Sequence, residues 1–404
     1  MNAVNTDQNS FAPPAKILWR QVWGLAALLA AITFSWIAYG FYQPRILIRI
    51  GFSDLAIWLG IFQGLLGAIV EPIVGWFSDR VLGKFGSRLP LIVVGVTLAG
   101  LIFVGVSWLV ETQISDGLRW VLPLLMTVWV VAMIIFRGPA IALLMSFAPT
   151  NQLPQANAIL ALVLAITSAT SPILGLIFKQ IGASMTFILG AIALLSGAVL
   201  LWRSMPRYLA TGTTPKIAVL LLNKTSLTGY ALPFLVGLGS GLEINLLLHL
   251  LPHRLFHAFD NLSVEYWQSG ILLIAGIATL PLRSLFRRQQ VTLGMGLGLL
   301  VIVICLILSF INNHIIYLAL VATLGAMALG LVLTNTIPLA LAMVSPSQAG
   351  FGTGLYFGGS GMGTTIFASL LVTQGEISPI NGTISSLVAL AIASICLYLF
   401  ANPK

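Results

Sequence analysis

"EPIVGWFSDRVLGKFGSRLP", residues 71–90, ends a long apolar run with an acid and a proline and follows it with Asp79-Arg80 and two further spaced cations. Charged residues make up only 7% of the 404 residues, and the mean hydropathy is +1.03. A water-soluble globule carries about a quarter of its residues charged. The chain must therefore meet lipid over most of its surface, and this stretch marks where a membrane span ends.

Apolar runs long enough to cross a membrane recur along the whole chain. About twenty apolar residues cross a 30 Å hydrocarbon core. The sequence predicts an all-α membrane protein with twelve transmembrane helices near residues 22–41, 55–77, 90–110, 120–138, 157–178, 183–202, 228–250, 264–282, 291–311, 314–336, 350–373 and 382–401. The longest polar gap, 203–227, is the predicted central loop between an N-terminal half, 1–202, and a C-terminal half, 228–404.

The cations of the predicted loops indicate an orientation, because cytoplasmic loops carry an excess of Lys and Arg. With both termini inside, thirteen cations are cytoplasmic: Lys16, Arg20, Arg80, Lys84, Arg88, Arg203, Arg207, Lys216, Lys224, Arg283, Arg287, Arg288 and Lys404. Five lie on the other side: Arg45, Arg49, Arg119, Lys179 and Arg254. The net charge of +9 is thus a signal of topology rather than of a nucleic-acid partner.

The loop at the end of the second span carries a recognisable pattern. Residues 75–88 follow G-x-x-x-D-R-x-x-G-x-x-x-x-R through Gly75, Asp79, Arg80, Gly83 and Arg88. The pattern resembles the loop between spans two and three of the major facilitator superfamily, and the resemblance implies two six-helix halves with the substrate between them. It also implies that the loop biases the inward/outward equilibrium. The other interpretation is that its cations only set the topology.

A narrower resemblance links the chain to the glycoside–pentoside–hexuronide branch and its sucrose-transporter relatives. It depends most on residues 41–95, through Pro44, Trp58, Glu71-Pro72, Ser78-Asp79-Arg80 and Gly86-Ser87-Arg88-Leu89-Pro90. The resemblance implies a symporter that moves a sugar or glycoside with H⁺ or Na⁺. Gly67 stands where melibiose-type carriers have a second acid, and Met145-Ser146 stand where sucrose carriers have an aspartate. These departures leave the coupling ion and the sugar open.

Ionisable residues inside spans are costly and are functional candidates by default. Glu71 in span two and Glu243 in span seven are the predicted coupling sites, because a lone buried carboxyl can exchange a proton. Arg137 in span four is the predicted charge partner of Glu71 or a substrate-binding cation. The alternatives are a static ion pair for Glu71 and Arg137, and a packing role for Glu243.

Spacing places Glu71 within a stripe of small residues. Gly60, Gly64, Gly67, Glu71 and Gly75 recur at intervals of three and four, so they are expected to share one helix face. Such a stripe packs closely against a neighbouring helix. We therefore expect Glu71 to point into protein and not into lipid.

Sugars are held by hydrogen-bonding side chains and by aromatic rings. The candidate substrate-binding residues of this kind are Gln63, Trp36, Tyr39, Asn157, Asn245, Asn335 and Tyr356. Trp36 and Tyr39 are equally explained as anchors at the membrane interface. His249, His253 and His257 follow span seven at helical spacing, but Pro252 interrupts them and no acid completes a ligand set, so no metal is expected.

Other functional classes find less support in the sequence. A Walker lysine motif and a nucleophile–base arrangement are both missing, so neither an ATP-driven pump nor an enzyme is expected. The alternatives to sugar transport are export of an amphiphilic solute and a chlorophyll-binding assembly factor of the same superfamily. We expect no cofactor, a monomer, and the inner membrane of a bacterium.

Overall fold

The computed structural model describes residues 16–112, 119–206, 227–259, 261–283 and 290–402, which form helices without a strand. The sequence explains this composition, because a backbone in lipid must satisfy its own hydrogen bonds and a helix does so within one segment. Residues 1–15 and most of the predicted central loop lie outside the described residues.

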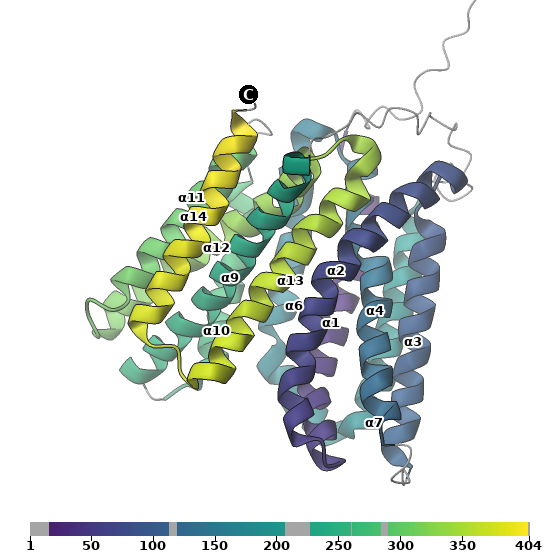
Figure 1. Ribbon diagram of the computed structural model, residues 1–404, viewed down its shortest axis with the longest axis horizontal. Helices are drawn as coiled ribbons and strands as arrows, with labels where there is room; N and C mark the ends of the chain where they lie inside the picture. The colour runs from purple at the N-terminus through teal and green to yellow at the C-terminus, as the bar shows by residue number, and fades with distance from the viewer. Residues whose placement is uncertain (1–15, 113–118, 207–226, 260, 284–289, 403–404) are drawn as a thin grey trace, which may run out of the picture.

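The helices follow one another in two groups (Figure 1). The first group contains α1 (Trp19–Arg49), α2 (Ser53–Phe85), α3 (Leu89–Glu111), α4 (Val121–Ala142), α5 (Leu144–Phe147), η2 (Thr150–Gln152), α6 (Leu153–Ala169) and α7 (Ser171–Ser204). The second contains α9 (Leu227–Ala258), α10 (Val264–Leu282), α11 (Val291–Leu308), α12 (Ile315–Ala342), η4 (Pro346–Gln348), α13 (Ala349–Gln374) and α14 (Pro379–Ala401). We call the end at which α1 begins and α14 ends the termini end.

Eleven of the twelve expected spans each overlap one described helix, and the span 157–178 is divided between α6 and α7. Eleven helical segments in the described part of the chain are long and apolar enough to cross a membrane. Eleven expected spans fall on these segments, although span 157–178 continues past the end of α6 into α7, where Gly182, with φ 82°, interrupts the helix before span 183–202 begins. The shorter α10 supplies the remaining span. The prediction of an all-helical membrane protein is confirmed.

Two local differences from the expected spans matter for the site. The first helix continues to Arg49 and contains Pro44, so Arg45 and Arg49 lie on its last turns and not in a loop. The expected span 157–178 is broken at Thr170 into α6 and the start of α7, where Pro172 follows. Proline cannot donate the helical hydrogen bond, which explains the break.

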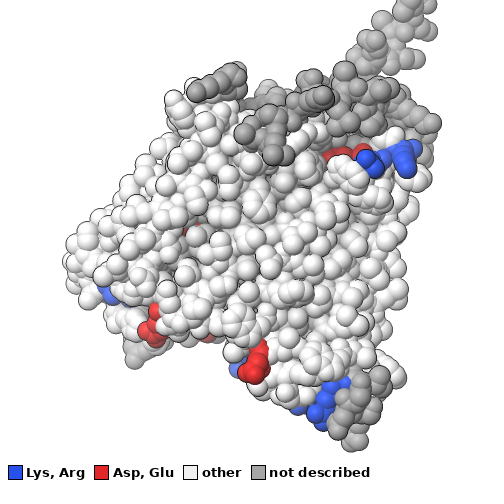
Figure 2. Space-filling model, in the orientation of Figure 1, with Lys and Arg blue, Asp and Glu red and all other residues white. Residues whose placement is uncertain are grey.

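The two groups of helices pack around separate cores. One cluster of buried side chains draws almost entirely on α1 to α7, and the other on α9 to α14. The groups meet along α2 with α13 and along α6 with α10, and Figure 1 shows α13 beside α2. Charged side chains gather near the two ends of the molecule, with a broad uncharged band between them (Figure 2). This band matches a lipid-facing surface.

Candidate functional site

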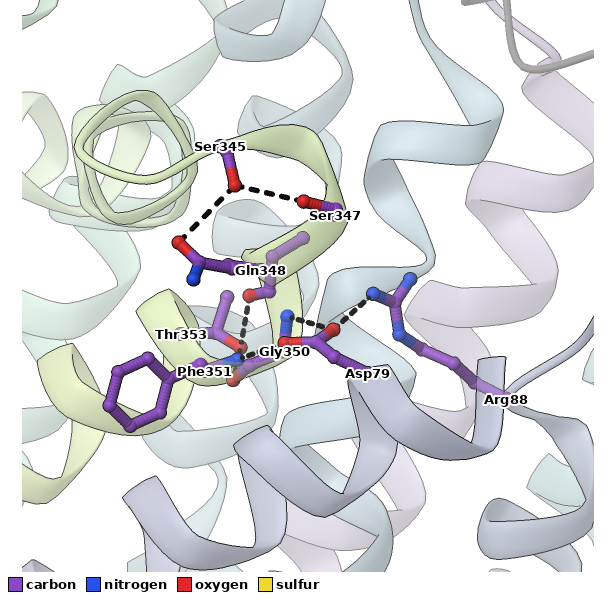
Figure 3. A network of polar contacts seen from close by, with 9 residues as sticks. Asp79, Arg88, Ser345, Ser347, Gln348, Gly350, Phe351 and Thr353 are labelled. Carbon is purple, nitrogen blue, oxygen red and sulfur yellow. Dashed lines mark hydrogen bonds and ion pairs between the residues drawn. The ribbon is translucent and has the colours of Figure 1, made fainter. Parts of the chain in front are cut away.

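The carboxylate of Asp79 joins the two groups of helices at the termini end. Its Oδ1 accepts a hydrogen bond from the Gly350 amide at 2.9 Å, and its Oδ2 accepts one from the Phe351 amide at 2.8 Å (Figure 3). Both amides belong to the first turn of α13, where backbone N–H groups have no partner within the helix. A side chain of α2 thus caps α13, and the negative charge also suits the positive end of the helix dipole. We call this contact the Asp79 cap.

Arg88 holds the Asp79 carboxylate from the other side. Its Nη2 donates to Oδ1 of Asp79 at 2.6 Å, and its side chain is only 3% exposed. Arg88 is the N-cap residue of α3, so this bond stays within the first group of helices. The orientation of Asp79 is therefore set by its own half of the chain, and the α13 amides dock onto it.

The remaining residues of the loop pattern have different roles. Arg80 stacks its guanidinium over the Trp76 ring at 3.7 Å, on the exposed side of α2. Gly83 lies half-buried near the end of the same helix. Gly75 is in backbone contact with Gly350, because a Cβ at Gly350 would lie only 2.7 Å from the Gly75 carbonyl oxygen. Asp79 and Gly75 thus contact α13 directly, and Arg88 orients the Asp79 carboxylate for this contact.

The small-residue stripe of α2 does not share one neighbour. Gly64 and Gly75 face α13, where a Cβ would meet Thr365 and Gly350 respectively. Gly67 instead faces Ile134 of α4, and Gly60 has no neighbour within 4 Å of a Cβ. The stripe lies on one continuous helix, but the expected single neighbour is wrong, because this face of α2 lies between α13 and α4.

Glu71 and Arg137 form an ion pair between α2 and α4. The Glu71 residue is 7% exposed, whereas the Arg137 side chain is 27% exposed. The guanidinium carbon of Arg137 also lies 5.4 Å from the ring centroid of Phe357 on α13. The second carboxylate oxygen, Oε2 of Glu71, has no hydrogen-bond partner. Three helices from both groups thus meet at one pair of opposite charges.

An aromatic and amide cluster occupies the core of the first group. Oη of Tyr39 donates to Oε1 of Gln63 at 2.8 Å, and Nε2 of Gln63 donates to Thr127 at 3.3 Å. The Tyr39 ring stacks on Trp129 with centroids 4.5 Å apart, and Trp36 meets Trp129 edge-on at 5.0 Å. Of these rings only Trp36 is half-buried, and the others are buried. Sequence reasoning missed Trp129 and Thr127, which a search for partners on span four could have found.

The polar candidates of the second group form hydrogen bonds within that group, to side chains and carbonyls that were not among the candidates. Tyr356 and Ser240 share a hydrogen bond of 2.7 Å, and Nδ2 of Asn245 donates to Thr364 at 3.0 Å. Asn335 donates to a carbonyl of its own helix, and its Oδ1 is unpaired. Asn157 reaches from α6 across to α12, donating to the carbonyls of Leu333 at 3.0 Å and Thr334 at 2.8 Å. Asn157 is therefore a second polar contact between the groups.

Glu243 lies apart from these contacts. It is 0% exposed, and neither carboxylate oxygen has a hydrogen-bond partner. Ionised carboxylates in such surroundings cost several kcal/mol unless they are paired. The rings of His249 and His253 lie at a tilted angle with their centroids 4.3 Å apart. Within the described residues no group of three or more His, Cys, Asp or Glu could hold a metal ion.

Comparisons with known proteins agree with this architecture. No protein-family model matches the chain. A bacterial homologue of the iron transporter ferroportin, in an outward-facing state, matches with a TM-score of 0.70 at 16% identity, over 94% of this chain and 99% of that chain. A structure of a bacterial ferroportin homologue in the outward-facing state with soaked iron matches with a TM-score of 0.67 at 15% identity, over 94% of this chain and 99% of that chain. The human organic anion transporter MFSD10 matches with a TM-score of 0.63 at 13% identity, over 95% and 98%.

At these identities the likeness shows the fold. The described residues form an all-helical membrane protein, and its two groups of helices have the arrangement found in major facilitator transporters. The narrower resemblance to sugar carriers is not supported by these structural matches, which name iron and organic anions for the proteins concerned.

Proposed function

We propose that the chain is a secondary transporter that works by alternating access, its two halves opening in turn at either end of the bundle. The Asp79 cap carries this proposal. It joins the halves through two hydrogen bonds from the backbone of α13 to one carboxylate. Such a contact can break and form again without unfolding either half, and a two-state element of this kind is what alternating access needs. The contact between Gly75 and Gly350 supports the same interpretation, because α2 and α13 meet there through backbone atoms, without interlocking side chains.

A sugar or glycoside is our proposed solute. Trp36 is half-buried beside the Tyr39–Gln63 pair, so an aromatic face and hydrogen-bonding groups lie close together. A sugar ring offers an apolar face and hydroxyl groups, which match this combination. The structural neighbours are named for iron and for organic anions, so ferrous iron and organic anions belong in the same transport panel.

Proton coupling is our proposal for the energy source, with Glu71 as its first site. The carboxylate shares an ion pair with Arg137 and keeps one oxygen unpaired, so protonation would weaken a contact among α2, α4 and α13. Glu243 is the second proposed site, because its burial without partners suits a group that carries a proton. We propose a bacterial inner membrane as its location on the basis of its size and short loops, and cytoplasmic termini on the basis of the Lys and Arg bias of the loops.

Proton movement in proteoliposomes tests this proposal. The wild type, Glu71→Gln and Glu111→Gln are reconstituted and given aryl glucosides, free sugars, organic anions and ferrous iron while internal pH is recorded. Glu111 is an exposed acid at the end of α3, so its variant is the matched control. We expect solute-dependent proton movement in the wild type and in the control, and its loss in Glu71→Gln.

Two other results would change the proposal. Proton movement with solute in all three proteins would assign coupling away from Glu71 and make Glu243→Gln the next variant. If no solute of the panel moves across the membrane, in protein shown to be folded by thermal unfolding, the transport proposal fails for these solute classes.

A further inference from the structure

A cavity of about 690 Å³ lies between the two halves at the end opposite the Asp79 cap. Its walls come from α1, from the start of α7 and from α10, with Leu248 of α9 at one side. Three charged side chains line it, namely Arg45 of α1, Lys179 of α7 and Glu265 of α10. None of these positions belongs to the coupling or substrate candidates of the sequence.

The helix break at Thr170 explains why the cavity forms there. Toward the termini end, α6 and α10 are in close contact: Oγ1 of Thr279 donates to the Ala158 carbonyl at 3.0 Å, and a Cβ at Gly276 would lie 3.0 Å from the Cβ of Ala165. Beyond Thr170 the chain resumes as α7 with Pro172, and the cavity begins at Ser168. The halves therefore part where the proline interrupts the helix.

The same break leaves polar groups at the cavity wall. Pro172 has no N–H to donate to the carbonyl four residues earlier, which is that of Ser168. The hydroxyls of Ser168 and Ser171 line the cavity from this side, and Gln268 and Ser269 line it from α10. The site can thus form hydrogen bonds with a polar solute from both halves at once.

The two cations at the cavity are available to a ligand. Arg45 is exposed, donates to the carbonyl of Phe41 in its own helix and stacks over the Phe41 ring at 3.8 Å. Lys179 is also exposed. Among the described residues, no acid lies within 4 Å of either cation in an ion pair. Within the described part of the chain, neither cation is therefore neutralised by an acid.

Glu265 does not cancel these charges directly. It lies in the first turn of α10, where a carboxylate is stabilised by the unpaired amides and the positive end of the helix dipole. Its charge therefore has a local partner in the backbone. The two cations face the cavity from the first group of helices and the acid faces it from the second, so the wall contributed by α1 and α7 is positive.

We propose that this cavity binds the carboxylate of a small organic anion, with Arg45 and Lys179 as its ligands and the serine and glutamine side chains as partners for hydroxyl groups. Apolar wall residues, among them Phe41 and Leu272, would contact the uncharged part of the solute. The inference rests on the proposed transport function and deepens it: the solute carries a negative charge and is first bound at the end opposite the Asp79 cap.

A pair of ligands that differ only in charge tests this site. Binding of 4-carboxyphenyl β-glucoside and of phenyl β-glucoside is measured by calorimetry with the full chain in nanodiscs of zwitterionic lipid. A charge-assisted hydrogen bond contributes enough to change affinity by about tenfold. We expect the carboxylated glucoside to bind the wild type about tenfold more tightly than the neutral one. Equal affinities would overturn the proposal without any variant.

Matched variants assign the preference to named residues. Arg45→Gln combined with Lys179→Gln should make the two affinities equal, and Glu265→Gln should strengthen binding of the carboxylated ligand by a few fold. Arg49→Gln, an exposed arginine one turn beyond Arg45 that does not line the cavity, should leave the preference unchanged. A charge preference that survives in the double variant would place the carboxylate elsewhere and refute the assignment.

A lipid headgroup is the other source of the same chemistry. Repeating the titration in nanodiscs that contain anionic lipid separates the two, because a lipid in the cavity would compete and abolish the charge preference. That result would refute the dissolved solute as the occupant. The transport proposal is tested separately by flux of both glucosides into proteoliposomes. Equal flux of the two glucosides would support transport and refute the anion site. Charge-selective binding without flux would support the anion site and refute transport.

Discussion

Replacing Asp79 by asparagine should shift the protein away from the conformation that is closed at the termini end. The carboxylate accepts hydrogen bonds from the Gly350 amide at 2.9 Å and from the Phe351 amide at 2.8 Å. Asparagine keeps one oxygen, loses the charge, and turns its NH₂ group toward a backbone donor. The bond from Arg88 lies within the first half, so we expect it to be kept in both conformations and not to contribute to the difference between them.

The magnitude follows from these bonds. A hydrogen bond to a charged group contributes about 1.5–3 kcal/mol. One such bond is lost and the other becomes neutral, so we expect the closed conformation to lose about 2 kcal/mol relative to the open one. At room temperature this raises the ratio of open to closed protein about 30-fold.

A buried cysteine at the contact between the halves measures this shift. Thr353 on α13 is 0% exposed. It lies one turn after Ala349 and one turn before Phe357, and both of these residues pack against the core of the first group, so Thr353 is on the same side of α13. In a Thr353→Cys background with Cys305 and Cys396 replaced by alanine, the rate of labelling by a membrane-impermeant maleimide in nanodiscs reports opening at the termini end. We expect Asp79→Asn to label about 30-fold faster than the unmodified background.

The acid at the other end of the same helix provides the control. Asp54 lies in the first turn of α2, and Asp54→Asn should leave the labelling rate unchanged. Equal labelling rates for Asp79→Asn and the background, with both proteins folded, would refute the reasoning. The cap would then be a static contact and not part of the conformational equilibrium.

Further predictions concern the interior of the bundle. Gly75→Ala places a methyl group against the Gly350 carbonyl and should destabilise the closed conformation by about 1–3 kcal/mol. Gly60→Ala is the control and should leave the closed conformation unchanged, because a Cβ at Gly60 has no neighbour within 4 Å. The maleimide labelling rate of Thr353→Cys measures both effects. Arg137→Gln leaves the Glu71 carboxylate unpaired and should lower the free energy of chemical unfolding by about 3 kcal/mol. Adding Glu71→Gln to the same chain should restore part of this loss. If the effects of the two substitutions simply add, the ion pair does not contribute to stability. Glu243→Gln should not lower the free energy of unfolding, because neither oxygen has a partner to lose and burial of an unpaired carboxylate is itself costly. A loss above about 3 kcal/mol would show that the carboxylate has a specific partner.

The fold was largely predictable because its determinants are local. An apolar run of about twenty residues leaves the chain little choice but a spanning helix, so eleven of the twelve expected spans each overlap one described helix. The loop pattern around Asp79 and the intramembrane charges of Glu71 and Arg137 were visible for a related reason. Charged groups are so rare in this chain that each one stands out against an apolar background.

The residues alone thus predict the number of spans and the residue types available for polar contacts, whereas the packing of the helices selects which of these residues meet. Asp79 pairs with amides 271 and 272 residues away, and backbone N–H groups leave no mark in a sequence. Gly67 faces α4 whereas Gly75 faces α13, although both lie on the same helix. The stacking of the Tyr39 ring on Trp129 likewise does not follow from the sequence. Lipid is as apolar as the helix surfaces, so hydrophobicity does not select neighbours, and the choice depends on close packing of shapes and on a few hydrogen bonds.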